Sequence, residues 1–339
     1  MGVDISDILI KHETRIEDHS GMTMAVDSYN IIYQFLSSIR QPDGTPLMDN
    51  DGNVTSHLSG LFYRSVSLIS AGLRLVYVLD GKPSSLKGNT LDERRMMREK
   101  NILELKKAEE AGDEERIRSL SGRINYLTRP MIDECRELLE AMGIPVVQAK
   151  SEGEAQASYM NAQGAVDGVI SQDYDCLLFG ARRVFRNMTF SGRRKVPGRN
   201  FYVNVRPEYI DLEENLSNLS INRRQLIWIG MLTGTDFNRG VHRVGAKTGL
   251  NLVRKGNTLQ QILEMKSATI ESLDEVEDIF LNPPHEEWGE IQLRPPDRES
   301  IIKILCDRHN FSPERVSPYV DTLSKLYSKG AQKSLDRFF

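Results

Sequence analysis

The chain has 339 residues, enough for one large α/β domain or for a core with a smaller attached module. Hydrophobic residues make up 39% of it and charged residues 27%, which is typical of a globular protein with a real core. The formal net charge of −4 lacks the basic excess of many DNA-binding domains, although binding depends on local rather than total charge.

The expected cellular compartment follows from three features that the sequence lacks: a membrane span, a signal peptide and paired cysteines. No run of residues approaches the roughly 20 apolar positions of a membrane span, and the first 20 residues lack the apolar stretch of a signal peptide. Cys135, Cys176 and Cys306 are far apart, which favours neither a disulfide framework nor a zinc site. We therefore expect a cytoplasmic protein that does not enter a membrane.

Four short apolar runs alternate with helical patterns, as in βαβ units around a parallel sheet. The runs cover residues 22–26, 73–79, 144–147 and 168–170. They are followed at once or closely by acidic residues: Asp27, Asp80, the pair Glu152 and Glu154, and Asp173. Because ligands of open α/β sheets bind at the carboxyl ends of the strands, these acids are expected to share one rim.

Residues 86–123 are densely charged and favour helix, with little apolar periodicity. Such a segment buries little against a core, so it is a pair of solvated helices, a mobile insertion or a flexible basic gate over a site. Arg193, Arg194, Lys195 and Arg199 form a second basic group. This group is expected to be either a solvated loop between strands or a region that follows a nucleic-acid backbone.

Helical patterns return from Asn222 to about Leu252, broken by the glycine-containing stretch GTDFNRGVHRVGAKTG. This break predicts a helix–turn–helix, which can present backbone N–H groups to a phosphate. A proline-marked connection is expected at residues 281–296, and helices at about 298–309 and 313–328. After Gly330 the helical pattern stops.

Seven carboxylates stand at the ends of these elements, and together they suggest a site for hard divalent ions. They are Asp27, Asp80, Glu152, Glu154, Asp173, Asp175 and Asp236. Two ions held close together can assist an in-line displacement at phosphorus. Each acid also has a structural interpretation, such as a helix cap at Asp27, a capping box from Ser151 to Glu154, or turn chemistry at Asp80 and Asp236.

The segments AVDSYNIIYQFL, YVLDGKP, SEGEAQA, SQDYDCLLFG and GTDF have the order and spacing seen in flap endonucleases, and the similarity spans the whole chain. The chain resembles the archaeal branch of that family. The resemblance implies an α/β fold with a mostly parallel, twisted, PIN-like 5′ nuclease sheet flanked by helices. It also implies a helical arch and a helix–turn–helix DNA-binding module.

The resemblance also implies a division of the chain into five parts. These are an N-terminal nuclease half (1–85), the arch (86–130), an internal nuclease half (131–240), a helix–turn–helix module with C-terminal helices (222–328), and a flexible tail (329–339).

By resemblance, Asp27, Asp80, Glu152 and Glu154 would hold one metal ion. Asp173, Asp175 and Asp236, with a share of Glu154, would hold a second. The expected ions are two Mg²⁺, with Mn²⁺ as an alternative. Lys87 and Arg94 would contact the scissile phosphate from the base of the arch, and without the family both read as surface charges.

Further residues would bind DNA by resemblance: Gly2, Tyr33, Arg40, Arg64, Gly234 and Lys247. Tyr33 would stack on a base near the cut, although its helix face also fits a core position. In the turn of the helix–turn–helix, Arg243 replaces a family glycine and Ala246 a proline. Since glycine often supplies a positive φ, this departure puts the turn geometry and the family's monovalent-ion site in doubt.

The last eight residues match the sliding-clamp (PCNA) binding pattern Q-x-x-L-x-x-F-F through Gln332, Leu335, Phe338 and Phe339. Two phenylalanines on a polar terminus are typical of a docking segment rather than of a core element. A frayed terminus without function is the alternative.

We therefore expect a structure-specific 5′ flap endonuclease with 5′–3′ exonuclease activity, a metal-dependent endodeoxyribonuclease of replication and repair. It would act as a monomer on branched DNA. The alternatives are a related DNA-repair nicking nuclease, an RNA-directed nuclease, an inactive scaffold for junction DNA and the clamp, and a small-molecule phosphatase on a doubly wound sheet.

Overall fold

The computed structural model describes residues 2–41, 44–113, 116, 117, 120, 127–189, 192–195 and 202–335. The chain divides into two compact units, each built from three stretches of sequence. The first unit contains Met1–Ser28, Val78–Leu91 and Gln148–Glu287, and the second Tyr29–Tyr77, Asp92–Val147 and Trp288–Phe339. No helix in the described part of the chain is long and apolar enough to cross a membrane.

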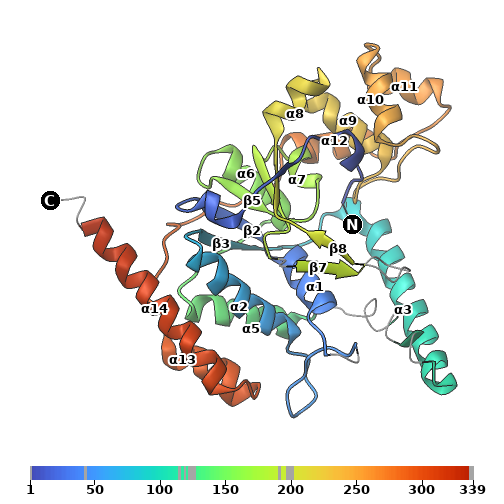
Figure 1. Cartoon of the computed structure of the whole chain (residues 1–339). Coiled ribbons are helices and arrows are strands. Elements are labelled where there is room, and N and C mark those ends of the chain that lie inside the picture. The colour runs from blue at the N-terminus through green and yellow to red at the C-terminus, as the bar shows by residue number, and fades with distance from the viewer. Residues whose placement is uncertain are drawn as a thin grey trace. The chain divides into compact units, whose positions relative to one another are not determined.

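Seven strands form one mixed sheet in the order β1-β9-β6-β5-β2-β3-β4. Figure 1 labels β5, β2 and β3 of this sheet. Their bounds are β1 His12–Glu13, β2 Thr23–Asp27, β3 Arg74–Leu79, β4 Val146–Gln148, β5 Gly168–Ile170, β6 Arg183–Arg186 and β9 Glu208–Asp211. Strand β5 runs parallel to β2 and β6, whereas β9 is antiparallel to β6 and β1. The expected parallel core is confirmed, with an antiparallel edge added to it.

Strand positions agree closely with the apolar runs of the sequence. Strand β5 has the expected bounds, and β2 ends at Asp27, where its carboxylate was predicted to lie. In β2, Met24, Ala25 and Val26 are fully buried, as befits a strand covered on both faces. Strand β4 begins two residues later than expected, at Val146.

A separate antiparallel ribbon joins β7 (Gly192–Lys195) to β8 (Tyr202–Val205) (Figure 1). The basic residues Arg193, Arg194 and Lys195 lie on β7, a strand of this ribbon, rather than in a loop between strands as expected. Arg199 lies outside the described residues.

The first unit also holds most of the shorter helices. They are η1 Ser6–Ile8, η2 Ile16–His19, η3 Ser85–Lys87, α6 Gly153–Ala162, α7 Asp175–Leu178, α8 Leu212–Leu219, α9 Arg223–Thr233, α10 Ala246–Arg254, α11 Leu259–Met265 and α12 Leu273–Leu281. Helix α6 packs on β2, β5 and α7, and thereby covers the sheet beside the ends of those strands.

Helices α9 and α10 pack together and form the predicted helix–turn–helix. Helix α9 begins with a capping box between Asn222 and Gln225. In the turn, Arg243 has φ +60°, the left-handed conformation that a glycine adopts most easily. The arginine therefore keeps the backbone shape that the family glycine would supply.

The second unit is mainly helical. It contains α1 Ser28–Ser38 apart from its first residue, α2 Ser56–Ser70, most of α3 Gly88–Ala111, α5 Arg129–Ala141, α13 Arg298–Ile302, the π-helical segment η4 Lys303–Arg308 and α14 Pro313–Leu335. Helix α2 packs against α5 and α14. The charged stretch is helical as predicted, and Met96, Met97 and Leu103 of α3 are exposed.

Helix α14 is longer than expected. It continues past Ser328 and Gly330 to Leu335, because Ala331, Gln332, Lys333 and Leu335 are good helix formers and one glycine costs only about 1 kcal/mol. The predicted connection before α13 is confirmed, since residues 283–297 form neither helix nor strand.

Candidate functional site

All seven predicted carboxylates belong to the first unit and lie at the ends of its elements. Asp27 is the last residue of β2, and Asp80 follows β3 directly. Glu152 and Glu154 flank Gly153, the first residue of α6. Asp173 lies between β5 and α7, and Asp175 is the first residue of α7. Asp236 follows the C-terminus of α9.

Mutual repulsion shows that these side chains form one connected cluster. Burial and, after it, the carboxylates of Asp27 and Glu152 together raise the pKa of Asp80 to about 8. Burial also raises the pKa of Glu154, which faces charge from Asp175, Asp173 and Asp27.

Asp175 connects the rest of the set. Burial raises its pKa to about 7, and the charges of Asp173 and Asp236 act in the same direction. A hydrogen bond from the Val3 backbone opposes this rise. Every one of the seven acids therefore faces at least one other, and holding them together in ionised form requires positive charge.

Hydrogen bonds from two backbone N–H groups and one hydroxyl orient three of the carboxylates. The Gly153 N–H donates to Asp80 Oδ1 (2.8 Å), and the Val3 N–H donates to Asp175 Oδ1 (2.8 Å). The Ser171 hydroxyl donates to Asp27 Oδ2 (2.8 Å). Sequence reasoning missed Ser171, whose only signal was its place between a strand and a predicted site residue.

The N-terminal segment contacts the cluster directly. The Gly2 N–H donates to Asp173 Oδ1 at 3.2 Å. A Cβ at Gly2 would lie 2.8 Å from Asp175 Oδ2 and 3.0 Å from Asp173 Cβ. Only glycine therefore fits here without displacing one of the two carboxylates.

Lys87 supplies positive charge inside the cluster. It ends η3 and is only 5% exposed. Its Nζ lies 2.5 Å from Glu152 Oε2, 3.5 Å from Asp236 Oδ2 and 3.7 Å from Glu154 Oε1. Although burial lowers the pKa of Lys87, these three carboxylates raise it above its ordinary value, so the ammonium stays charged.

The oxygen-rich donor set suits a hard divalent ion. Asp175 is fully buried, and its Oδ2 has no hydrogen-bond partner among the described residues, which leaves an oxygen available to a cation. No described group of three histidine, cysteine or carboxylate side chains is already arranged as a coordination shell. The residues fit a metal by chemistry and burial.

Purely structural interpretations of these acids receive little support. Glu152, not Ser151, is the residue at the N-terminal cap of α6, and no side-chain capping bond occurs there. The capping-box interpretation of Glu154 is therefore wrong. The Asp80 carboxylate accepts its hydrogen bond from Gly153, more than 70 positions away, rather than from its own turn.

Other predicted DNA-binding residues are distributed over both units. Tyr33 is 42% exposed, so the interpretation of it as a core residue is wrong. The Arg40 guanidinium donates to the carbonyl oxygens of Leu36, Ser37 and Gly44 and thereby braces its own turn. Arg64 lies on α2, and Arg94 is exposed on α3. Their contacts with DNA stay predictions.

In the first unit, Gly234 has φ +107°, and a Cβ there would meet the Gly240 nitrogen at 2.9 Å. Lys247 is exposed on α10 and forms an ion pair with Asp7 at 3.1 Å. Of the tail residues, Gln332 and Leu335 lie within α14, whereas Phe338 and Phe339 lie outside the described residues.

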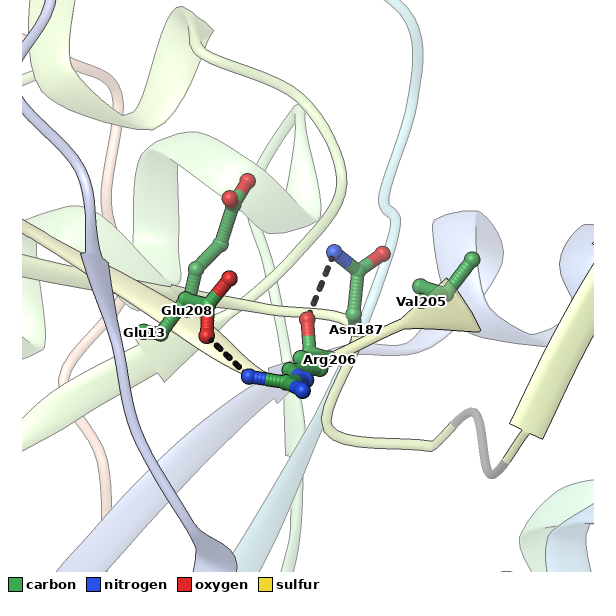
Figure 2. A pocket seen from close by; sticks show the side chains of 5 residues that line it. All are labelled: Glu13, Asn187, Val205, Arg206 and Glu208. Carbon is green, nitrogen blue, oxygen red and sulfur yellow. Dashed lines mark hydrogen bonds and ion pairs between the residues drawn. The ribbon is translucent and has the colours of Figure 1, made fainter. Parts of the chain in front are cut away.

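A separate cavity of about 520 Å³ lies in the first unit and shares no residue with the cluster. Figure 2 shows its lining residues, Glu13, Asn187, Val205, Arg206 and Glu208. Arg206 pairs with Glu13 at 2.7 Å, and its carbonyl accepts a hydrogen bond from Asn187. The cationic charge in this cavity is thus already neutralised.

Comparison with known proteins agrees with this geometry. Residues 1–101 match the XPG N-terminal domain, and residues 143–236 match the XPG I-region. The chain is 55% identical to flap endonuclease 1 of Picrophilus torridus and 48% identical to that of Methanothrix thermoacetophila, with full coverage of both chains in each case.

Solved structures show the same fold. Flap endonuclease-1 from Methanococcus jannaschii matches with a TM-score of 0.77 and 40% identity, over 97% of this chain and 100% of that one. The catalytic core of Rad2 in complex with DNA substrate matches in fold, with a TM-score of 0.71 and 23% identity, over 95% and 100% of the two chains. With full-length identity of this order and the carboxylate cluster in place, the chain belongs to the flap endonuclease family.

Proposed function

We propose that this protein is a structure-specific 5′ flap endonuclease with accompanying 5′–3′ exonuclease activity. It would hydrolyse DNA phosphodiesters at flap junctions during replication, including Okazaki-fragment processing, and during repair inside the cell. The carrying observation is the connected set of seven carboxylates in a chain of the flap endonuclease family.

The cluster supports binding of two divalent ions, Mg²⁺ or alternatively Mn²⁺. Asp27, Asp80, Glu152 and Glu154 form one repelling group, and Asp173, Asp175 and Asp236 form the other, with Glu154 facing both. When bound, two such ions supply a nucleophilic hydroxide and stabilise the attacking and leaving oxygens. The protein contributes the fixed carboxylates and the backbone donors that orient them.

Positive side chains would bind the scissile phosphate. Lys87 is already inside the cluster, and Arg94 follows it on α3, two turns along the helix. We assign both to the arch at residues 86–130. Since their contact would strengthen as charge develops on the phosphate, they would contribute more to rate than to affinity.

DNA and the clamp are the proposed partners. The exposed ring of Tyr33 supports stacking on a base, and the α9–α10 turn supports contact with the duplex backbone. Two solved structures of the same fold hold DNA: Rad2 with DNA substrate and human GEN1 with Holliday junction DNA. Residues 332–339 would bind the sliding clamp, and the protein would act as a monomer.

Cleavage of labelled DNA tests the proposal. We expect Mg²⁺-dependent cutting of a 5′ flap at its junction, weaker cutting of nicked duplex, and no cutting of any substrate in EDTA. Asp173→Ala should abolish cutting while flap binding persists, because it removes a proposed metal ligand.

An inactive scaffold would bind the flap without cutting it. A small-molecule phosphatase would hydrolyse a phosphate monoester and leave the flap intact, and either result would refute the proposal.

A further inference from the structure

Lys87 occupies a place that its role as a phosphate contact does not explain. A side chain that serves only to meet DNA would be expected in solvent, yet Lys87 is 5% exposed. Its Nζ lies in contact with three members of the cluster, and it also lies 5.0 Å from the centroid of the Phe237 ring. The ammonium is thus held among the carboxylates by both charge and an aromatic face.

The local backbone fixes this position. Ser84 caps η3 by accepting the Leu86 N–H, and the Ser84 N–H reaches toward Glu152 Oε1 at 3.4 Å. The same glutamate accepts from Lys87 through its other oxygen. Glu152 therefore ties the whole η3 segment to the start of α6.

These oxygens are the ones a divalent ion would use. Mg²⁺ binds carboxylate oxygens at about 2.0–2.1 Å, so an ion on Glu152 Oε2 would lie within about 4–5 Å of the Lys87 ammonium, which is 2.5 Å from that same oxygen. Two cations at such a distance repel strongly where the surroundings are dry. The cluster can satisfy its oxygens with Lys87 or with the ion, but not fully with both.

We propose that Lys87 is a tethered competitor of the divalent ions: metal binding displaces its ammonium from Glu152, Glu154 and Asp236, and so releases it toward the substrate phosphate. This inference rests on the proposed function. The next residue, Gly88, is exposed and begins α3. Because glycine has more backbone freedom than any other residue, the junction can change direction when the lysine leaves.

Such competition orders the events of a turnover. Without metal, the ammonium neutralises carboxylates that would otherwise repel one another. With metal, the same charge becomes available beside the site, where a phosphate needs it. The Lys87 ammonium would thus become available to the DNA phosphate only after the carboxylate cluster has bound its metal ions.

Metal binding by the DNA-free protein tests the competition. We compare Lys87→Met, which keeps the length of the side chain without its charge, with Lys82→Met, an exposed lysine five residues earlier. If the ammonium occupies the carboxylates about nine-tenths of the time, its removal should tighten Mn²⁺ binding about tenfold, measured by electron paramagnetic resonance of free Mn²⁺. Lys82→Met should bind Mn²⁺ like the wild-type protein.

A second measurement separates displacement from simple repulsion at a distance, and it needs no variant. Lys87 in wild-type protein should react slowly with an acylating reagent in EDTA and several-fold faster in Mg²⁺, as read by peptide mass spectrometry. The reactivity of Lys82 should not change. Because this measurement uses the native protein, it remains decisive if Lys87→Met fails to fold.

Unchanged Mn²⁺ affinity in a folded Lys87→Met, or Lys87 reactivity that Mg²⁺ does not raise, would overturn the inference. Wild-type protein that still cut flaps in Mg²⁺ would show that the proposed function survives that failure. Absence of flap cleavage with normal Lys87 release would sink the function instead, so the two outcomes are distinguishable.

Discussion

Asp80→Asn should stabilise the metal-free protein while abolishing its activity. The substitution keeps the size of the side chain and an oxygen that can accept the Gly153 N–H, now 2.8 Å from Asp80 Oδ1. It removes a charge that burial and the carboxylates of Asp27 and Glu152 oppose. The same charge is a proposed metal ligand, so stability and activity should change in opposite directions.

The magnitude follows from the pKa of Asp80, which rises from 3.8 to about 8 on folding. The folded state thus binds a proton that the unfolded chain releases, so stability falls as pH rises from about 4 to about 8. At pH 7 the penalty has an upper limit of about 4 kcal/mol, at about 1.4 kcal/mol per pH unit. Since asparagine accepts the Gly153 N–H less strongly than a carboxylate does, part of this gain is lost, and we expect about 1–2 kcal/mol, or about 1–3 °C in Tm for a chain of this length.

Thermal unfolding in EDTA at pH 5, 6, 7 and 8 measures this gain, with flap cleavage in Mg²⁺ measured in parallel. The difference in Tm between Asp80→Asn and wild type should grow with pH, because asparagine does not titrate. Glu271→Gln, an exposed carboxylate in the same unit, serves as the control and should show no such trend. A Tm difference that shrinks with pH, or cleavage at the wild-type rate, would refute the reasoning.

Four further predictions follow from single features of the structure. Mg²⁺ should raise the Tm of the wild-type protein more at pH 8 than at pH 6, because burial raises the pKa values of Asp175 and Glu154 and protons compete with the ion at the lower pH. Gly2→Ala should lower the single-turnover cleavage rate at least about tenfold with little change in Tm, since its Cβ would press on Asp175; an unchanged rate would contradict the close contact. Arg243→Gly should raise the free energy of unfolding by about 0.5–1 kcal/mol, and with it Tm slightly, because it relieves a positive φ. Arg243→Ala should not raise either. Deletion of residues 332–339 should leave short-flap cleavage unchanged but abolish stimulation by the sliding clamp, as measured by clamp titration of both forms; equal stimulation would place the main clamp contact elsewhere.

Local pattern was enough to predict where the carboxylates lie. An apolar run that ends in an acid places that acid at the carboxyl end of a strand, and parallel strands bring those ends to one edge. Asp27 and Asp80 follow this rule directly. Asp236 follows it less simply, because it comes after a helix, and its place in the cluster needed the family resemblance.

Contacts across long separations could not be predicted from the sequence. Lys87 lies in a charged stretch, where pattern alone indicates a solvated side chain. Its burial depends on Glu152 and Asp236, which the fold brings to it from 65 and 149 positions away. Gly2 was expected near the site only from the family resemblance, and the backbone donor at Val3 has no sequence signature, since every residue except proline carries an N–H.

The turn at Arg243 shows a different limit. Substitution of a glycine by arginine left the turn geometry in doubt, and the structure has Arg243 at φ +60°. Hydrogen bonds on both sides of the turn, such as Val241 N–H to the Leu232 carbonyl and Val244 N–H to the Val241 carbonyl, determine the path of the chain. A residue identity constrains a turn less than the contacts that close it, and the strain then falls on the residue.

The negative net charge of the chain comes largely from the carboxylate cluster. A net charge of −4 counted mildly against a DNA partner, yet seven of the 48 acidic residues belong to one buried cluster. Without them the remainder of the chain is slightly basic, and β7 carries three basic residues and no acidic one. The carboxylates repel one another because the proposed chemistry requires several oxygen ligands in one place. The charge that argued against DNA binding is therefore largely the charge of the site proposed to cut DNA.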